Sequence, residues 1–209
     1  MKKNIALFCS CILMQVAYTQ NLIVDDTLAL KKGIYKTYQE FKLNSPSIPL
    51  DYNIQAEILV YSNLSQVEAF THRDTCYTLK IEKEKANETG TVWGFCDGKN
   101  VYINRETSIS SGKVIFKPYS KFYKLLFIGR YCYFKVAYRS GGGFTYGILA
   151  IDFNSGELLE LSKNKVKKYI SKDEKLYHDF NNEGSWNDST FFRYLKLYSE
   201  KHKDEIKRN

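Results

Sequence analysis

Short turn signals between runs of β-branched and aromatic residues are the feature that most constrains this fold. The clearest case is Asp97-Gly98, which lies between residues 91–96 and 99–103. An Asp-Gly pair between two such runs predicts a two-residue β-hairpin turn, because both central positions need positive φ. Gly94 in the first run predicts a bulge or a close approach of the backbone. Connections this short join antiparallel strands, since parallel strands need long crossovers.

The same alternation of strand-forming and turn-forming residues recurs over most of the chain. Residues 123–138 form the longest β-rich run, which we expect to break or bend at Gly129. Residues 65–71 are ambiguous between a turn of helix and a loop, and the charged residues 82–88 indicate a solvated loop or hairpin. In all, the pattern predicts about eight strands. They cover residues 54–61, 76–82, 91–96, 99–103, 112–116, 123–138, 144–153 and 158–161.

Helical spacing replaces this pattern near the N-terminus and in the last fifty or so residues. Each predicted helix follows a residue that can act as its N-cap. These caps are Thr37 for a short helix to about residue 44, Ser162 for one to residue 169, Asp173 for a third, and Asp188 or Ser189 for the longest, to about residue 206. Strands followed by helices predict an α+β fold: an antiparallel sheet of about eight strands, as a meander or roll, with the short N-terminal helix and C-terminal helices packed on it.

The first 20 residues are organised like a secretory signal peptide. Two lysines precede an apolar run over residues 5–14, and Ala17 and Thr19 place small side chains at positions −3 and −1 for a cut before Gln20. A membrane-spanning helix needs about 20 apolar residues, so this run is too short to be one. The alternative is a buried first helix or strand. We therefore expect an exported chain whose residues 21–209 form one domain without a transmembrane segment, in the periplasm, at the cell surface or outside the cell.

The chain is basic, with a formal net charge of +8 at pH 7. A basic balance suits nucleic acid, an anionic membrane face or an acidic polysaccharide. Export argues against nucleic acid. The lysines are also spread out, apart from those within residues 163–168 and 201–208, and spread charge is typical of a solvated surface.

Cysteine is sparse in the expected mature chain, which contains Cys76, Cys96 and Cys132. Three is an odd number, so one disulfide at most can form within the chain. Cys76 and Cys132 each lie between apolar or aromatic residues and are the favoured pair. The alternative is three buried thiols that behave as small hydrophobic side chains. Either way, the fold depends on its hydrophobic core and not on a disulfide framework.

No catalytic or metal-binding pattern is present in the sequence. The histidines of the expected mature chain, His72, His178 and His202, show no zinc spacing, and we expect neither a metal nor another cofactor. A Cys–His nucleophile pair such as Cys96 with His178 or His72 requires assembly in space. The acidic pairs Asp152 with Glu157 and Asp179 with Glu183 have ordinary surface spacing, and the glycines of residues 141–143 lead into a strand, as in a hairpin turn. The sequence therefore favours a binding role over catalysis.

Aromatic residues are unusually frequent, at 17 Tyr, 13 Phe and 2 Trp. Sheet formation is the first explanation, because these rings suit half-buried pleated surfaces. Binding is the second, since rings exposed near loops can stack on sugars or peptides. Two turns, Asp97-Gly98 and residues 141–143, lie near the possible ligand-contact residues, which are Trp93, Tyr102, Tyr131 and Tyr146. Taken singly, each of them fits a core or cross-strand position better than a ligand contact.

Three segments carry a resemblance to a known group of proteins. They are GIYKTYQEFKLNSPS at residues 33–47, VWGFCDGKNVYI at residues 92–103 and GRYCYF at residues 129–134. They resemble a family of uncharacterised secreted proteins, with a domain of unknown function, from Bacteroidota-type bacteria. The resemblance implies an envelope location. It carries no activity, and therefore no functional residues, over to this chain.

Three classes of function follow from these patterns. The first is a binding or interaction module of the cell envelope, whose partner is an envelope protein or a glycan. The second is an envelope enzyme, hydrolase-like, with a site that the sequence does not reveal. The third is a structural or assembly component of the envelope that uses an edge strand or the basic C-terminal helix.

Overall fold

A computed structural model describes the backbone of residues 23–24, 29–65, 68–104, 117, 120–140 and 143–206. It describes their side chains except those of residues 59–65, 68–74, 137–140 and 143–146. The predicted signal peptide and the strand predicted at residues 112–116 lie outside these ranges.

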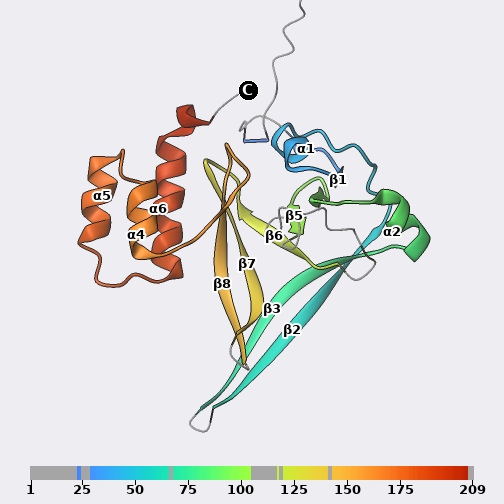
Figure 1. The fold of residues 1–209 in the computed structure, drawn as a ribbon, viewed down its shortest axis with the longest axis horizontal. Helices are drawn as coiled ribbons and strands as arrows, with labels where there is room; N and C mark the ends of the chain where they lie inside the picture. The colour runs from blue at the N-terminus through green and yellow to red at the C-terminus, as the bar shows by residue number, and fades with distance from the viewer. Residues whose placement is uncertain are drawn as a thin grey trace, which may run out of the picture.

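The fold is α+β, as predicted, with an antiparallel sheet and a group of C-terminal helices (Figure 1). The strands of the described part are β1 Gly33–Tyr35, β2 Asn53–Ser65, β3 Glu68–Lys80, β4 Gly94–Cys96, β5 Val101–Asn104, β6 Phe122–Phe127, β7 Tyr131–Ser140, β8 Gly143–Asp152 and β9 Leu158–Leu159. The helices of the described part are α1 Tyr38–Lys42, α2 Lys83–Thr89, α4 Lys163–Tyr169, α5 Glu174–Asn181, α6 Asp188–Lys201 and the 3-10 helix η1 Lys203–Glu205. In the described part of the chain, no helix is both long and apolar enough to cross a membrane.

The sheet runs in the order β1-β4-β5-β6-β7-β8-β9, and every pairing in it is antiparallel. Strands β2 and β3 form a long ribbon that stands off this path. Their pairing continues without a shift from Asn53 opposite Lys80 to Ser65 opposite Glu68. The ribbon joins the sheet where Tyr77 of β3 lies opposite Phe122 of β6. From there it runs beside the β7–β8 hairpin, where β2 contacts β8, and its far end extends beyond that hairpin at the bottom of Figure 1.

Two local predictions in this part of the chain are wrong. Residues 68–71, expected to form a helical turn or a loop, belong to β3 and lengthen the ribbon. The charged residues 83–89 form helix α2, which buries Ala86 and Thr89. In both cases a tertiary contact decided a segment whose own sequence pattern was weak.

The hairpin predicted at Asp97-Gly98 is present, but its turn type differs. Strands β4 and β5 close at Cys96 opposite Val101, so the loop has four residues and not two. Gly98 has the positive φ, at 96°. The Asp97 carboxylate accepts hydrogen bonds from the backbone N–H groups of Lys99 at 2.7 Å and Asn100 at 2.6 Å. Asp97 therefore stabilises the loop through its side chain.

The predicted close approach at Gly94 is confirmed. A Cβ on Gly94 would lie 2.4 Å from the backbone oxygen of Tyr102, so any other residue would push β4 and β5 apart. The predicted break in the long β-rich run is also present, between the end of β6 and the start of β7.

The helix starts follow local hydrogen bonds. The side chains of Thr37, Ser162 and Asp173 accept from the backbone N–H three residues ahead and cap α1, α4 and α5, as predicted. For α6 the cap is Asn187 and not Asp188 or Ser189. That helix ends at Lys201, short of the predicted residue 206, and η1 follows.

Hydrophobic cores lie on both faces of the sheet. The C-terminal helices pack on β7, β8 and β9, and this core includes Tyr131, Ala150, Ile170, Phe180 and Leu195. The other face of the sheet packs with α1, β4 and β5. It presents the alternate residues of the same strands, such as Cys132, Phe134 and Ile151. Alternation along β7 therefore gives Tyr131 to one core and Cys132 to the other.

Candidate functional site

Three of the four predicted ligand-contact residues are buried. Trp93, Tyr102 and Tyr131 expose 5%, 6% and 5% of their surface. They also belong to three separate cores and do not come together. Tyr146 lies on β8 opposite Ala137, and its side chain is outside the described set. The expectation of an exposed aromatic surface is therefore wrong for three residues and stays a prediction for Tyr146.

Ring packing explains the burial of Trp93 and Tyr102. Trp93 stacks on Phe41 with ring centroids 4.5 Å apart. Tyr102 stacks on Phe95 at 4.7 Å, and its hydroxyl donates to Asp97 at 2.9 Å. Large rings release the most water when buried, and a tyrosine can be buried when its hydroxyl finds an acceptor.

The three cysteines of the described part are buried and form no disulfide. The favoured Cys76–Cys132 pair is thus not joined, and the three-thiol alternative holds. Burial raises the pKa of Cys132 to about 12. Burial likewise raises the pKa of Cys96. Since the reactive form of cysteine is the thiolate, neither residue is prepared to act as a nucleophile at neutral pH.

His178, on α5, and Cys96, at the end of β4, contact different residues. His178 is largely exposed and contacts Asn182 and Asp179 of its own helical segment. Cys96 is buried at the end of β4, where its sulfur accepts from the Gly98 N–H at 3.3 Å. The side chain of His72 lies outside the described set. The hypothetical Cys96–His178 pair is therefore not assembled.

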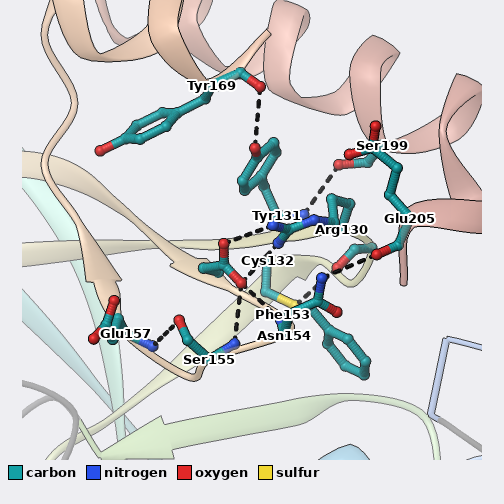
Figure 2. A network of polar contacts seen from close by, with 12 residues as sticks. Arg130, Tyr131, Cys132, Phe153, Asn154, Ser155, Glu157, Tyr169, Ser199 and Glu205 are labelled. Atoms are coloured by element: carbon teal, nitrogen blue, oxygen red, sulfur yellow. Dashed lines mark hydrogen bonds and ion pairs between the residues drawn. The ribbon is translucent and has the colours of Figure 1, made fainter. Parts of the chain in front are cut away.

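A network of polar contacts joins the sheet to the C-terminal helices (Figure 2). Its centre is Arg130, just before β7, which pairs at two points with Asp152 at the end of β8. The two N–O distances are 2.7 and 2.8 Å, and both side chains are largely buried. We call Arg130, Asp152, Asn154, Ser199 and Glu205 the junction network.

Two further contacts of the junction network hold the turn after β8, and two others cross between elements. The Asp152 carboxylate also accepts from the backbone N–H groups of Asn154 and Ser155, at 2.7 and 3.1 Å. The Asn154 side chain donates to the backbone oxygen of Glu205 at 2.9 Å, and the Ser199 hydroxyl accepts from the Tyr131 N–H at 3.1 Å. The β8 turn and the start of β7 are thereby tied to the end of α6 and to η1.

Electrostatics hold Asp152 in its charged form. Burial alone would raise the pKa of this carboxyl, but the hydrogen bonds from Arg130 and from two backbone N–H groups outweigh it and lower the pKa. A carboxylate saturated in this way is a poor general base, because its lone pairs are already occupied. The sequence pattern, which placed Asp152 with Glu157 on an ordinary surface, missed this ion pair because Arg130 is 22 residues away.

A second polar group lies beside the network, at the end of α6. Asp173 is buried and accepts from Lys201 at 2.5 Å, from His202 at 3.0 Å and from the N–H of Leu176 at 3.1 Å. These hydrogen bonds and charges lower the pKa of Asp173, although burial opposes them. Glu205 accepts from the Tyr198 hydroxyl at 2.9 Å. We call Asp173, Tyr198, Lys201, His202 and Glu205 the cap cluster.

The two polar groups therefore position helices. Their carboxylates are all satisfied by partners within the chain, and among the described residues no group of three or more His, Cys, Asp or Glu side chains is arranged to hold a metal ion. Neither group presents a nucleophile beside a base. The chemistry available here is structural: charge pairing across element boundaries.

The outer edge of β2 has a different character. Strand β2 pairs with β3 along one edge, and no strand of the described part pairs with its other edge. Ile58 on this strand exposes 64% of its surface, the most among the exposed large hydrophobic residues described. An unpaired strand edge offers a row of backbone donors and acceptors to another chain.

Comparisons with known proteins add no relative. No family model matches the chain, and neither a curated protein nor a solved structure is significantly similar to it.

Proposed function

We propose that this protein is an exported cell-envelope interaction module that binds an extended segment of a partner protein along the outer edge of β2. The observation that carries the proposal is the projecting β2–β3 ribbon, whose β2 edge has no strand partner in the described part of the chain. Export itself is inferred from the organisation of residues 1–20.

The physics of an isolated ribbon supports this role. A two-stranded hairpin is marginally stable in water, and a third strand on an open edge stabilises it. Proteins that avoid such pairing place charges or prolines along the edge. Strand β2 contains no proline, and Glu57 is its single charged residue. Its edge is therefore open to strand addition, in which backbone hydrogen bonds supply affinity and side chains supply selectivity.

A protein segment fits the structure better than a glycan does. The glycan hypothesis depended on exposed rings at Trp93, Tyr102 and Tyr131, and these rings are buried. An extended peptide needs no aromatic platform. The enzyme hypothesis gains no support from the described residues, whose buried thiols and paired carboxylates lack a reactive arrangement.

Site-specific crosslinking in the host tests the proposal. A photo-crosslinking phenylalanine derivative is incorporated at Ile58, and in the matched control at Leu197 on α6, which is also exposed, at 42%. We expect discrete adducts with an envelope protein from position 58 and not from position 197. Mass spectrometry of the adduct identifies the partner segment. In a separate pull-down without the crosslinker, an Ile58→Lys substitution should weaken capture of that partner, because charge on an edge opposes strand pairing.

Two results would contradict the proposal. One is the same adduct pattern from positions 58 and 197, which would indicate random collision. The other is recovery of the chain from the cytoplasm with residues 1–20 still attached, which would remove it from the envelope.

A further inference from the structure

Apolar and polar side chains alternate along the first half of β2. From Asn53 to Ile58 the order is Asn, Ile, Gln, Ala, Glu and Ile. Because successive side chains of a strand point to opposite faces, Ile54, Ala56 and Ile58 share one face of the ribbon, and the three polar side chains share the other. This stretch includes the junction of the ribbon with β6 (Figure 1). The two faces offer a neighbouring strand different chemistry.

The apolar face of β2 becomes more exposed along the strand. Ile54 is half-buried and packs against the core that contains Leu79 and Phe122. Ala56 and Ile58 are exposed, and Ile58 shows 64% of its surface to solvent. A strand added at the outer edge of β2 would place every second side chain beside this apolar row. Apolar residues at those positions would be stabilised there, because they exclude water together with the row.

The polar face carries one charge. Glu57 is partly buried, and its carboxylate lies 3.9 Å from the Sγ atom of Cys76, the residue opposite it on β3. A thiol is a weak donor and leaves the negative charge uncompensated. Among the ion pairs of the described residues, none includes Glu57. A partly desolvated carboxylate of this kind favours a partner that supplies a cation.

We propose that the β2 edge selects an extended protein segment with apolar residues at alternate positions and a lysine or arginine between them, beside Glu57. The inference rests on the proposed function and names the chemistry of its partner. Residues opposite each other on adjacent strands share a face, so the added strand meets the apolar row on one face and Glu57 on the other. Backbone hydrogen bonds supply affinity, and the charge pair supplies selectivity.

A second copy of this chain does not meet these requirements. Strand β2 contains no lysine or arginine, so β2 of another copy cannot place a cation beside Glu57. Pairing of two β2 strands would add a second carboxylate to the edge and no counter-charge. The composition of β2 therefore favours a different protein as the partner.

Selection from a displayed peptide library tests the preference. The probe is a phage library of random twelve-residue segments, which is panned on the processed protein and on three variants. Glu57→Gln removes the charge at nearly constant size, and Glu57→Lys reverses it. Glu174→Lys, the matched control, makes the same reversal at an exposed carboxylate of α5. A photo-crosslinking phenylalanine derivative at position 58 shows which enriched segments lie at the β2 edge.

We expect the crosslinked segments to carry apolar residues at every second position and Lys or Arg at an intervening one. Replacement of that cation by Glu, in a synthetic copy of an enriched segment, should weaken binding by roughly fivefold, because an attraction between adjacent strands becomes a repulsion. The Glu57→Gln variant should bind the two peptides about equally, and Glu57→Lys should prefer the peptide with Glu. The Glu174→Lys control should keep the preference of the natural protein.

Two results would overturn this inference and leave the proposed function standing. They are crosslinked segments without an excess of Lys or Arg, and an excess that Glu57→Gln leaves unchanged. Adducts between two copies of the chain from position 58 would also overturn the inference, because they would assign the edge to self-association. The absence of any segment or host protein that crosslinks at position 58 would remove the proposed function itself.

Discussion

Arg130 is the residue on which the junction network depends. The Arg130 side chain is 13% exposed, and the side chain of its partner Asp152 is 19% exposed. Such a pair contributes little net stability compared with a well-packed apolar pair, but the loss of one partner leaves an uncompensated charge in a poorly hydrated place. The structure also contains an exposed arginine pair, Arg193 with Glu183, where 54% of the arginine side chain is exposed. The two arginines allow a direct comparison of burial.

We predict that Arg130→Met lowers the free energy of unfolding by about 3 kcal/mol, since Asp152 stays buried without its counter-charge. Arg193→Met should lower it by less than about 1 kcal/mol, because water screens the exposed pair. Urea unfolding followed by circular dichroism measures both values. Equal effects of the two substitutions would show that the buried Arg130–Asp152 pair contributes no more to stability than an exposed pair.

At the scale of elements, the β2–β3 ribbon and the body of the protein are held by different contacts. Beyond Tyr77, where β3 meets β6, the two strands of the ribbon pair with each other. Cores on both faces of the sheet stabilise the body. The outer part of the ribbon is therefore expected to be dispensable for folding and necessary for contact with a partner.

Shortening the ribbon tests this division. Ile58 and Thr75 lie opposite each other, so an Asn-Gly turn in place of residues 59–74 can close the hairpin between them. We predict that the free energy of unfolding changes by less than about 1 kcal/mol, because the removed residues pair among themselves. The yield of crosslinks between position 58 and the host partner should fall sharply. Loss of cooperative unfolding in the shortened protein would contradict the prediction and make the ribbon part of the folding core.

For the whole molecule, two largely buried aspartates join elements of the C-terminal half. Asp152 joins the end of β8 to the start of β7 through Arg130, and Asp173 joins the start of α5 to the end of α6. Hydrogen bonds from Arg130 and backbone N–H groups lower the pKa of Asp152, although burial opposes them, and those from Lys201, Leu176 and His202 do the same for Asp173. A carboxyl whose pKa is lower in the folded state stabilises that state at every pH above its unfolded pKa, which is about 3.9. As the pH falls below that value, the unfolded chain takes up protons first, and the stabilisation declines through the folded pKa.

We therefore predict that the free energy of unfolding is level from about pH 7 to pH 5 with respect to these two groups and decreases between about pH 4 and pH 2. Asp173→Asn should be less stable than the natural chain at pH 7 and should lose less on acidification. Urea unfolding at pH 7, 5 and 3 measures this difference. Parallel pH profiles for the two proteins would show that Asp173 does not contribute to acid sensitivity.

The sequence predicted those parts of the candidate sites that depend on neighbours along the chain. The strand that supplies the open edge was expected at residues 54–61. The sequence did not predict that β2 continues to Ser65 or that its far edge has no partner, since pairing is set by other strands. It also placed Trp93, Tyr102 and Tyr131 near a contact surface, whereas ring packing from distant residues buries them.

By itself, the sequence determined the α+β class, the antiparallel pairing and the starts of α1, α4 and α5. The interactions behind these features join residues a few positions apart, such as Thr37 with the N–H of Glu40, so local pattern is sufficient. The tertiary structure alone decided the helix at Lys83–Thr89, the Arg130–Asp152 pair and the choice of buried rings. Those features arise when surfaces distant in sequence exclude water together, and free energy of that kind depends on which faces meet.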